Sequence, residues 1–252
     1  SLNADYFDFN LRNAGIYDYL YTEENVLKLA SFIDSAIRNT APESQYRARV
    51  ELINSEFAPL KERLSKTRKK NKAVFNCPYT ESKPIIDGIL NDNCWKLAPP
   101  SEFLSILGEK PEFPTKLYLS WDESNLYIAI DNYEPLVSKL KTDTKKRDAA
   151  EAPWPWCDDS IEIFLDPHRE SEKTYFHIIV TAEGVIWDSF HENPMDKNGN
   201  TGWNSSIEFK ILTGKSNWVL EAAIPLKDFG ISKASENMAF SGNFCRTRSC
   251  GK

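Results

Sequence analysis

The sequence lacks any apolar run near the length of about 20 residues that spans a bilayer. It also lacks a basic excess, because 31 Lys and Arg residues stand against 37 Asp and Glu residues. The resulting net charge of −6 disfavours binding to the phosphate backbone of nucleic acid. From these two absences we expect no membrane span and no nucleic-acid partner.

Common catalytic motifs are missing as well. The sequence has no phosphate-binding loop, no HExxH motif and no recognisable Ser/His/Asp arrangement. A glycosidase needs two carboxylates about 5–10 Å apart, and no pair stands out among Asp159, Glu162, Asp188 and Glu221. Glu221 lies within an apolar run, which favours a structural acid that bridges strands. We expect no catalysis within this chain.

The five cysteines do not identify a cellular compartment. An odd number cannot pair completely, and no CxxC spacing suggests zinc. Cys245 and Cys250 are close enough in sequence for a local disulfide, and reduced core thiols are the alternative. The redox environment therefore stays open.

What the sequence does contain is a series of short alternating segments. A polar entry at residues 158–160 leads into an alternating, β-branched strand at 161–165. Because no βαβ alternation is present, we expect an antiparallel β-sandwich of jelly-roll-like type rather than a parallel sheet. Turn clusters separate three pairs of segments and predict hairpins: 116–121 with 125–130, 175–181 with 185–188, and 207–211 with 218–224.

The first 70 residues show a helical pattern instead. Thr22 is a predicted N-cap, and apolar residues follow it at helical spacing as far as Ile37. A second helix is predicted from Pro42, although Pro59 should kink or shorten it. A cationic stretch at residues 66–72 is typical of a linker. Since two helices bury little surface alone, this N-terminal α-helical hairpin must pack on the sandwich or belong to something larger.

Four short motifs recur in order through the second part of the chain. They are PIIDGILNDNCW at 84–95, WCDDSIEIFLDP at 156–167, WVLEAAIPL at 218–226 and NFCRTR at 243–248. Together they resemble the family 9 carbohydrate-binding modules, which are β-sandwiches appended to secreted bacterial glycoside hydrolases. The resemblance implies that this chain binds a mono- or oligosaccharide without cleaving it.

The resemblance also suggests how the chain is organised. The motif YRARVE at residues 46–51 is similar to the helical end of an α-glucuronidase-related bacterial domain of unknown function, which often precedes such a module. We therefore expect residues 1–70 to be the remnant of a preceding domain and residues 71–252 to be the carbohydrate-binding sandwich. That sandwich is expected to be truncated, because the family continues with further strands after the position of Lys252.

The sharpest candidate for sugar contact is the stretch Pro153-Trp154-Pro155-Trp156. Two prolines stiffen the loop, so its aromatic side chains lose little entropy when a ligand binds. The family places an aromatic residue just before the strand that carries the equivalent of Glu162, and Trp156 lies six residues ahead of Glu162. The alternative is that Trp154 or Trp156 packs in the core beneath the loop.

The remaining ligand contacts are predicted from fewer signals. The family uses a polar pair on the next strand, where this sequence has isoleucine, so His177 is a substitute or a structural histidine. Trp203 is the nearest replacement for the family's second aromatic. Arg246 and Arg248 alternate and should share one face, where they either form ion pairs with Glu162 or Asp159 or donate to sugar hydroxyls or to a uronic carboxylate.

Calcium and haem are the two candidate cofactors. Family members often carry structural calcium, an ion that takes six to eight oxygen ligands. Here the candidate ligands are acids in turns, which could equally cap the turns: Asp87, Asp92, Asp158 and Asp159. Related sandwiches hold haem between a methionine and a histidine, and here the available residues are Met195, Met238, His168, His177 and His191. Met238 lies close to Phe240 and is expected to fill the core.

The sequence therefore predicts a non-catalytic carbohydrate-binding module within a polysaccharide-degrading protein. By resemblance, that protein is secreted or periplasmic and bacterial. The alternative is a structural module that docks an upstream catalytic domain of the same polypeptide and has no affinity for sugar. A buried Trp154–Trp156 loop would favour this docking function.

Overall fold

The computed structural model describes residues 74–104, 110–149, 151–168, 174–192, 199–236 and 238–250, with five isolated residues nearer the N-terminus. The chain divides into two units, Ser1–Phe75 and Asn76–Lys252. The five isolated residues are helical, but the predicted hairpin at residues 22–64 otherwise lies outside the described residues. No helix in the described part of the chain is long and apolar enough to cross a membrane.

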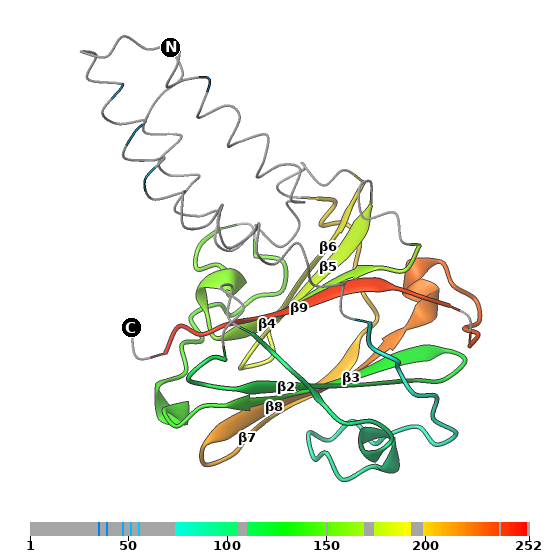
Figure 1. Cartoon of the computed structure of the whole chain (residues 1–252). Helices are drawn as coiled ribbons and strands as arrows, with labels where there is room; N and C mark the ends of the chain where they lie inside the picture. The colour runs from blue at the N-terminus through cyan, green and yellow to red at the C-terminus, as the bar shows by residue number, and fades with distance from the viewer. Residues whose placement is uncertain are drawn as a thin grey trace. The chain divides into compact units, whose positions relative to one another are not determined.

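The unit Asn76–Lys252 contains two antiparallel sheets that face each other as a sandwich (Figure 1). This confirms the predicted fold class. In spatial order, the first sheet consists of β1 (Ser101–Glu102), β2 (Thr115–Trp121), β3 (Asn125–Tyr133), β8 (Asn217–Pro225) and β7 (Glu208–Thr213). The second consists of β6 (Ile186–His191), β5 (Tyr175–Thr181), β4 (Ser160–Asp166) and β9 (Ser241–Thr247). In the described parts of the connections there are four short 3₁₀ helices: η1 (Asn93–Lys96), η2 (Val137–Lys139), η3 (Pro155–Cys157) and η4 (Leu226–Phe229).

The three predicted hairpins are confirmed as β2–β3, β5–β6 and β7–β8. In the first of them, Oδ1 of Asp122 accepts hydrogen bonds from the backbone N–H groups of Ser124 and Asn125, each at 2.7 Å. In the second, the turn passes through Gly184 with φ +86°, a conformation that costs a glycine little. The short-range turn chemistry therefore decides where each of these chain reversals occurs.

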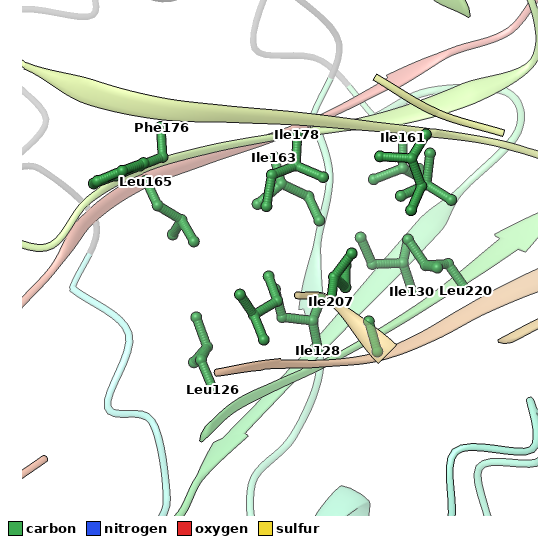
Figure 2. Close-up of a cluster of buried hydrophobic side chains, with 14 of the residues drawn as sticks. Leu126, Ile128, Ile130, Ile161, Ile163, Leu165, Phe176, Ile178, Ile207 and Leu220 are labelled. Carbon is green, nitrogen blue, oxygen red and sulfur yellow. The ribbon is translucent and has the colours of Figure 1, made fainter. Parts of the chain in front are cut away.

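The core lies between the two sheets. Figure 2 shows Ile161, Ile163 and Leu165 of β4 facing Ile128 and Ile130 of β3. Because successive side chains of a strand point to opposite faces, the residues that alternate with these isoleucines face away from the core. All seven residues of β4 are nevertheless buried, so both faces of this strand are covered.

The motif PIIDGILNDNCW at residues 84–95 covers the outer face of the five-stranded sheet. Gly88, at φ +86°, donates its backbone N–H to Oε2 of Glu221 at 2.7 Å, and Trp95 donates its indole N–H to Oε1 at 2.9 Å. A Cβ on Gly88 would lie 2.6 Å from Cβ of Leu212, so a side chain cannot fit there. Burial raises the pKa of Glu221. Glu221 is thus a structural acid, although it binds the 87–95 segment rather than a neighbouring strand.

Candidate functional site

The outer face of the four-stranded sheet brings together the chemically most distinctive side chains of the sandwich. Ile161 and Ile163 of β4 and Ile178 of β5 point into the core, so Glu162 and His177 point to this outer face. The two side chains are 4% and 6% exposed, respectively. They form a buried polar pair surrounded by aromatic rings.

The carboxylate of Glu162 is held from two sides. Nε2 of His177 lies 3.1 Å from Oε2, and the hydroxyl of Thr247 on β9 donates to Oε1 at 3.3 Å. The ring of His177 in turn stacks on Phe164, its cross-strand neighbour, with centroids 4.1 Å apart. An ionised carboxylate can accept about four hydrogen bonds. Glu162 therefore keeps acceptor capacity beyond His177 and Thr247.

The predicted aromatic loop lies beside this pair. Pro155 begins η3, which packs on β4 and β5, and the backbone N–H of Cys157 donates to the carbonyl of Trp154 at 2.9 Å. The indoles of Trp154 and Trp156 stack with centroids 5.0 Å apart and an interplanar angle of 7°. Both are half-buried, so the loop is only partly covered and neither tryptophan belongs to the core cluster between the sheets.

Trp187, which was not predicted as a site residue from the sequence, connects the loop to the polar pair. Its indole meets Trp156 edge-on at 5.8 Å and His177 edge-on at 5.2 Å. Trp187 lies opposite Ile179 in the β5–β6 register, on the same face as His177. The alternation of side chains along residues 185–188 could have indicated on which face of its strand Trp187 lies. The order of the strands in the sheet was needed to place Trp187 next to Trp156.

Trp203 lies apart from this group. Its ring packs on Phe176 and Phe229 at centroid distances of 4.9 and 6.4 Å, against the core cluster between the sheets. Its indole N–H donates to the carbonyl of Asp228 at 3.4 Å. The structure thus gives Trp203 packing partners and does not bring it to the face that carries Glu162.

Arg246 and Arg248 share one partner, as their alternation predicts, but that partner is Glu134. Nη2 of Arg246 lies 3.0 Å from Oε2 of Glu134, and Nε of Arg248 lies 2.7 Å from the same atom. The alternative of ion pairs with Glu162 or Asp159 is therefore wrong, whereas donation to a sugar stays a prediction. The reason is register: Arg246 lies opposite Ile161, so it points to the core side of the sheet, whereas Glu162 points to the other side.

Three of the four acids predicted as calcium ligands bind the backbone instead, and the fourth, Asp92, has a buried Oδ2 without a hydrogen-bond partner among the described residues. The carboxylate of Asp158 accepts from the N–H groups of Asp143 and Thr144 at 3.0 and 2.9 Å, and that of Asp159 accepts from Lys141 and Ser249 at 2.8 and 3.1 Å. Oδ1 of Asp87 accepts from Ile89. Among the described residues, the one group of three possible metal ligands is Glu134, Asp159 and Cys250. A thiol is not the oxygen donor that calcium requires, and two arginines already neutralise Glu134. Calcium binding stays a prediction.

The remaining candidates are distributed over the unit. All five cysteines are free thiols, so Cys245 and Cys250 form no bridge. His191 is buried, with its Nε2 2.8 Å from the hydroxyl of Ser189, and His168 is exposed. Met238 is 38% exposed rather than core filler, and Met195 lies outside the described residues.

Comparison with known proteins identifies the family. Residues 86–249 match the family described as "Carbohydrate family 9 binding domain-like", which is more than half of the chain. The chain belongs to this family. The family 9 domain thus includes both sheets of the sandwich, with the Trp154–Trp156 loop, Glu162 and His177 inside the matched range.

Two solved structures resemble the fold of the family 9 domain. Both are of a family 9 carbohydrate-binding module from Caldicellulosiruptor kristjanssonii, one in complex with cellotriose and one with glucose. The first has a TM-score of 0.51 at 20% identity and covers 69% of this chain and 76% of that chain. The second has a TM-score of 0.50 at 19% identity and covers 69% and 78%.

A curated relative shares the sequence of the domain. The endo-1,4-beta-xylanase A of Thermotoga neapolitana is 28% identical over 148 residues, which is 57% of this chain. The matched segment is only 12% of that enzyme. The resemblance therefore concerns one domain of a much longer protein.

Proposed function

We propose that the family 9 domain binds a mono- or oligosaccharide at the outer face of the four-stranded sheet, without cleaving it. The observation that carries the proposal is the contact chain from the half-buried Trp156 through Trp187 to the His177–Glu162 pair. Apolar sugar faces pack on indole rings, and sugar hydroxyls need charged acceptors beside them. This face combines both kinds of group within a few ångströms.

In this proposal Trp156 stacks on one sugar ring and Trp154 holds the indole of Trp156 in place from behind. Glu162 accepts a hydrogen bond from a sugar hydroxyl, in competition with the 3.3 Å contact from Thr247. Stacking contributes about 0.5–1.5 kcal/mol beyond area burial, by analogy with aromatic pairs. A hydrogen bond to a charged group adds roughly 1.5–3 kcal/mol. After the cost of immobilising the ligand, we expect micromolar-to-millimolar affinity.

The relatives support a carbohydrate ligand and a polysaccharide-degrading context. The two structural neighbours were solved with cellotriose and glucose, and the curated relative is a xylanase. We infer that the whole protein degrades a polysaccharide outside the bacterial cytoplasm, and that this domain brings its catalytic part to the substrate. Sequencing the flanking gene would test that inference directly.

The ligand proposal is tested by titration. Wild-type protein, Trp154→Ala and Trp156→Ala are titrated with glucose, xylose and their trisaccharides, and melting temperatures are measured in parallel. We expect Trp156→Ala to abolish measurable binding with little change in melting temperature. Trp121→Ala is the matched control, because that indole packs on Tyr79 at the far sheet. Equal affinities in wild type and Trp156→Ala would place the site elsewhere, and no binding by wild type would favour the docking function.

A further inference from the structure

The chain just ahead of the tryptophan loop forms a hollow of about 450 Å³. Its lining residues lie within 143–146, 149 and 151–153 and include Lys146 and Glu151. This volume falls in the range of about 300–1,000 Å³ that small-molecule sites occupy. Ala152 and Pro153, which form part of the lining, lead directly into Trp154. The hollow and the proposed stacking loop are therefore neighbours along one short stretch of chain.

The wall of the hollow is anchored on the sandwich at several points. The backbone N–H of Thr144 donates to Asp158 at 2.9 Å, and its hydroxyl donates to the carbonyl of Pro153 at 3.2 Å. Further along, Nη2 of Arg147 lies 2.7 Å from the buried carboxylate of Asp188. The backbone N–H of Asp148 donates to the carbonyl of Ile186 at 3.2 Å. These bonds hold Thr144 of the lining, and Arg147 and Asp148 between the lining residues, on the sandwich before any ligand arrives. Such anchoring lowers the entropy lost on binding.

The charges in the lining are balanced. Lys145 is paired with Glu183, and Asp143 with Lys141. Lys146 and Glu151 are exposed and have no ion-pair partner among the described residues. A cation and an anion that are unpaired among the described residues together suit a neutral ligand whose hydroxyls both accept and donate hydrogen bonds. A uronate would gain one contact with Lys146 but would be repelled by Glu151.

We propose that this hollow is a second subsite, which takes a neutral sugar residue linked to the one stacked on Trp156. Trp156 lies three positions after Pro153, and three residues span at most about 11 Å. A trisaccharide bridges that distance. The proposal rests on the proposed function, because the hollow adds affinity only for a chain that is already held at the tryptophan loop.

The test compares two ligands of different length on each variant. The probes are glucose and cellotriose, with xylose and xylotriose as a second pair, titrated against the wild-type chain by calorimetry. In the wild-type chain the trisaccharide should bind about tenfold more tightly than the monosaccharide, which corresponds to about 1.4 kcal/mol. In the double variant Lys146→Ala/Glu151→Ala this ratio should fall below about threefold, while the affinity for the monosaccharide stays unchanged.

A steric variant and a matched control make the test decisive. Ala152→Trp places a large side chain at the lining of the hollow. It should lower the ratio of trisaccharide affinity to monosaccharide affinity in the same way as the double variant. Lys215→Ala/Glu236→Ala removes the same two charge types from exposed positions elsewhere and should leave the ratio at its wild-type value.

The outcomes separate the subsite from the proposed function. If the ratio of trisaccharide affinity to monosaccharide affinity stays at its wild-type value in both the double variant and Ala152→Trp, the subsite proposal is overturned. If Trp156→Ala still abolishes monosaccharide binding in that case, the proposed function stands. A wild-type chain that binds neither probe pair overturns both proposals.

Discussion

Nε2 of His177 lies 3.1 Å from Oε2 of Glu162, and this contact is diagonal across β4 and β5. Directly opposite Glu162 in the register is Ile179, and directly opposite His177 is Phe164. The carboxylate therefore has one apolar and one polar neighbour on β5. Diagonal pairs of this kind are within reach of long side chains. In this sheet the pair fixes the orientation of the acid next to the tryptophan loop.

The first prediction concerns this acid. Glu162→Gln keeps the shape of the side chain but removes its charge, so it should weaken sugar binding about tenfold or more. The melting temperature should change little, because the amide oxygen still accepts from Thr247. Calorimetric titration with the best wild-type ligand measures the effect. Glu236→Gln, at an exposed position, is the control. Unchanged affinity in Glu162→Gln would remove this acid from the site.

The second prediction concerns the buried cluster around Glu134. Replacing Glu134 with Gln leaves Arg246, whose side chain is 6% exposed, without its counter-charge. The loss of one partner from a buried ion pair costs about 3–5 kcal/mol. Urea unfolding at pH 7 should show a loss of this size. Glu208→Gln on the exposed β7 should cost far less, and similar losses for the two variants would contradict the prediction.

The same cluster predicts a pH dependence. Although burial alone would raise it, hydrogen bonds from Arg248 and Cys250 hold the pKa of Glu134 below its ordinary value of 4.5. A carboxyl group with a lowered pKa in the folded state stabilises the fold above its ordinary pKa, and this contribution disappears as the pH falls through the folded-state value. The unfolding free energy of the wild type should therefore decrease below about pH 4.5. Glu134→Gln should show a shallower decrease, and parallel curves for the two proteins would argue against this role.

The third prediction concerns the outer face of the five-stranded sheet. Glu221→Ala leaves three donors without an acceptor: the N–H groups of Asp87 and Gly88 and the indole N–H of Trp95. We expect a loss of about 2–4 kcal/mol in unfolding free energy, because buried unsatisfied donors are costly. The amides of Asp87 and Gly88 should also exchange faster with solvent deuterium. Wild-type protection of these two amides in Glu221→Ala would mean that other contacts hold the segment.

The fourth prediction concerns catalysis. The purified chain should release no reducing sugar from cellulose, xylan or their oligosaccharides, because no carboxylate pair stands out as an acid and a nucleophile. A reducing-end assay over a range of pH values measures this. Activity that Glu162→Gln abolishes would contradict the prediction and would turn the binding face into an active site.

Local patterns were sufficient for much of the fold. The turn residues at 122–124 and 182–184 predicted where hairpins form, and alternation predicted a strand at 161–165. Both signals depend on neighbours in the sequence, since side chains alternate with a period of two and turn residues bond their own backbone. For the same reason the tryptophan loop could be placed directly ahead of the strand that carries Glu162.

The partners of Arg246 and Trp187 could not be predicted in this way. Alternation correctly placed Arg246 and Arg248 on one face, but their acceptor, Glu134, lies 112 and 114 residues away in the sequence. Which face they share depends on β9 pairing with β4 in the register that sets Arg246 opposite Ile161, and a shift of one residue would have turned both arginines toward Glu162. The amino-acid sequence alone thus determined the strands, the turns and the chemical types at the site. Strand order and register, set by backbone hydrogen bonds between distant segments, decided which of these side chains meet.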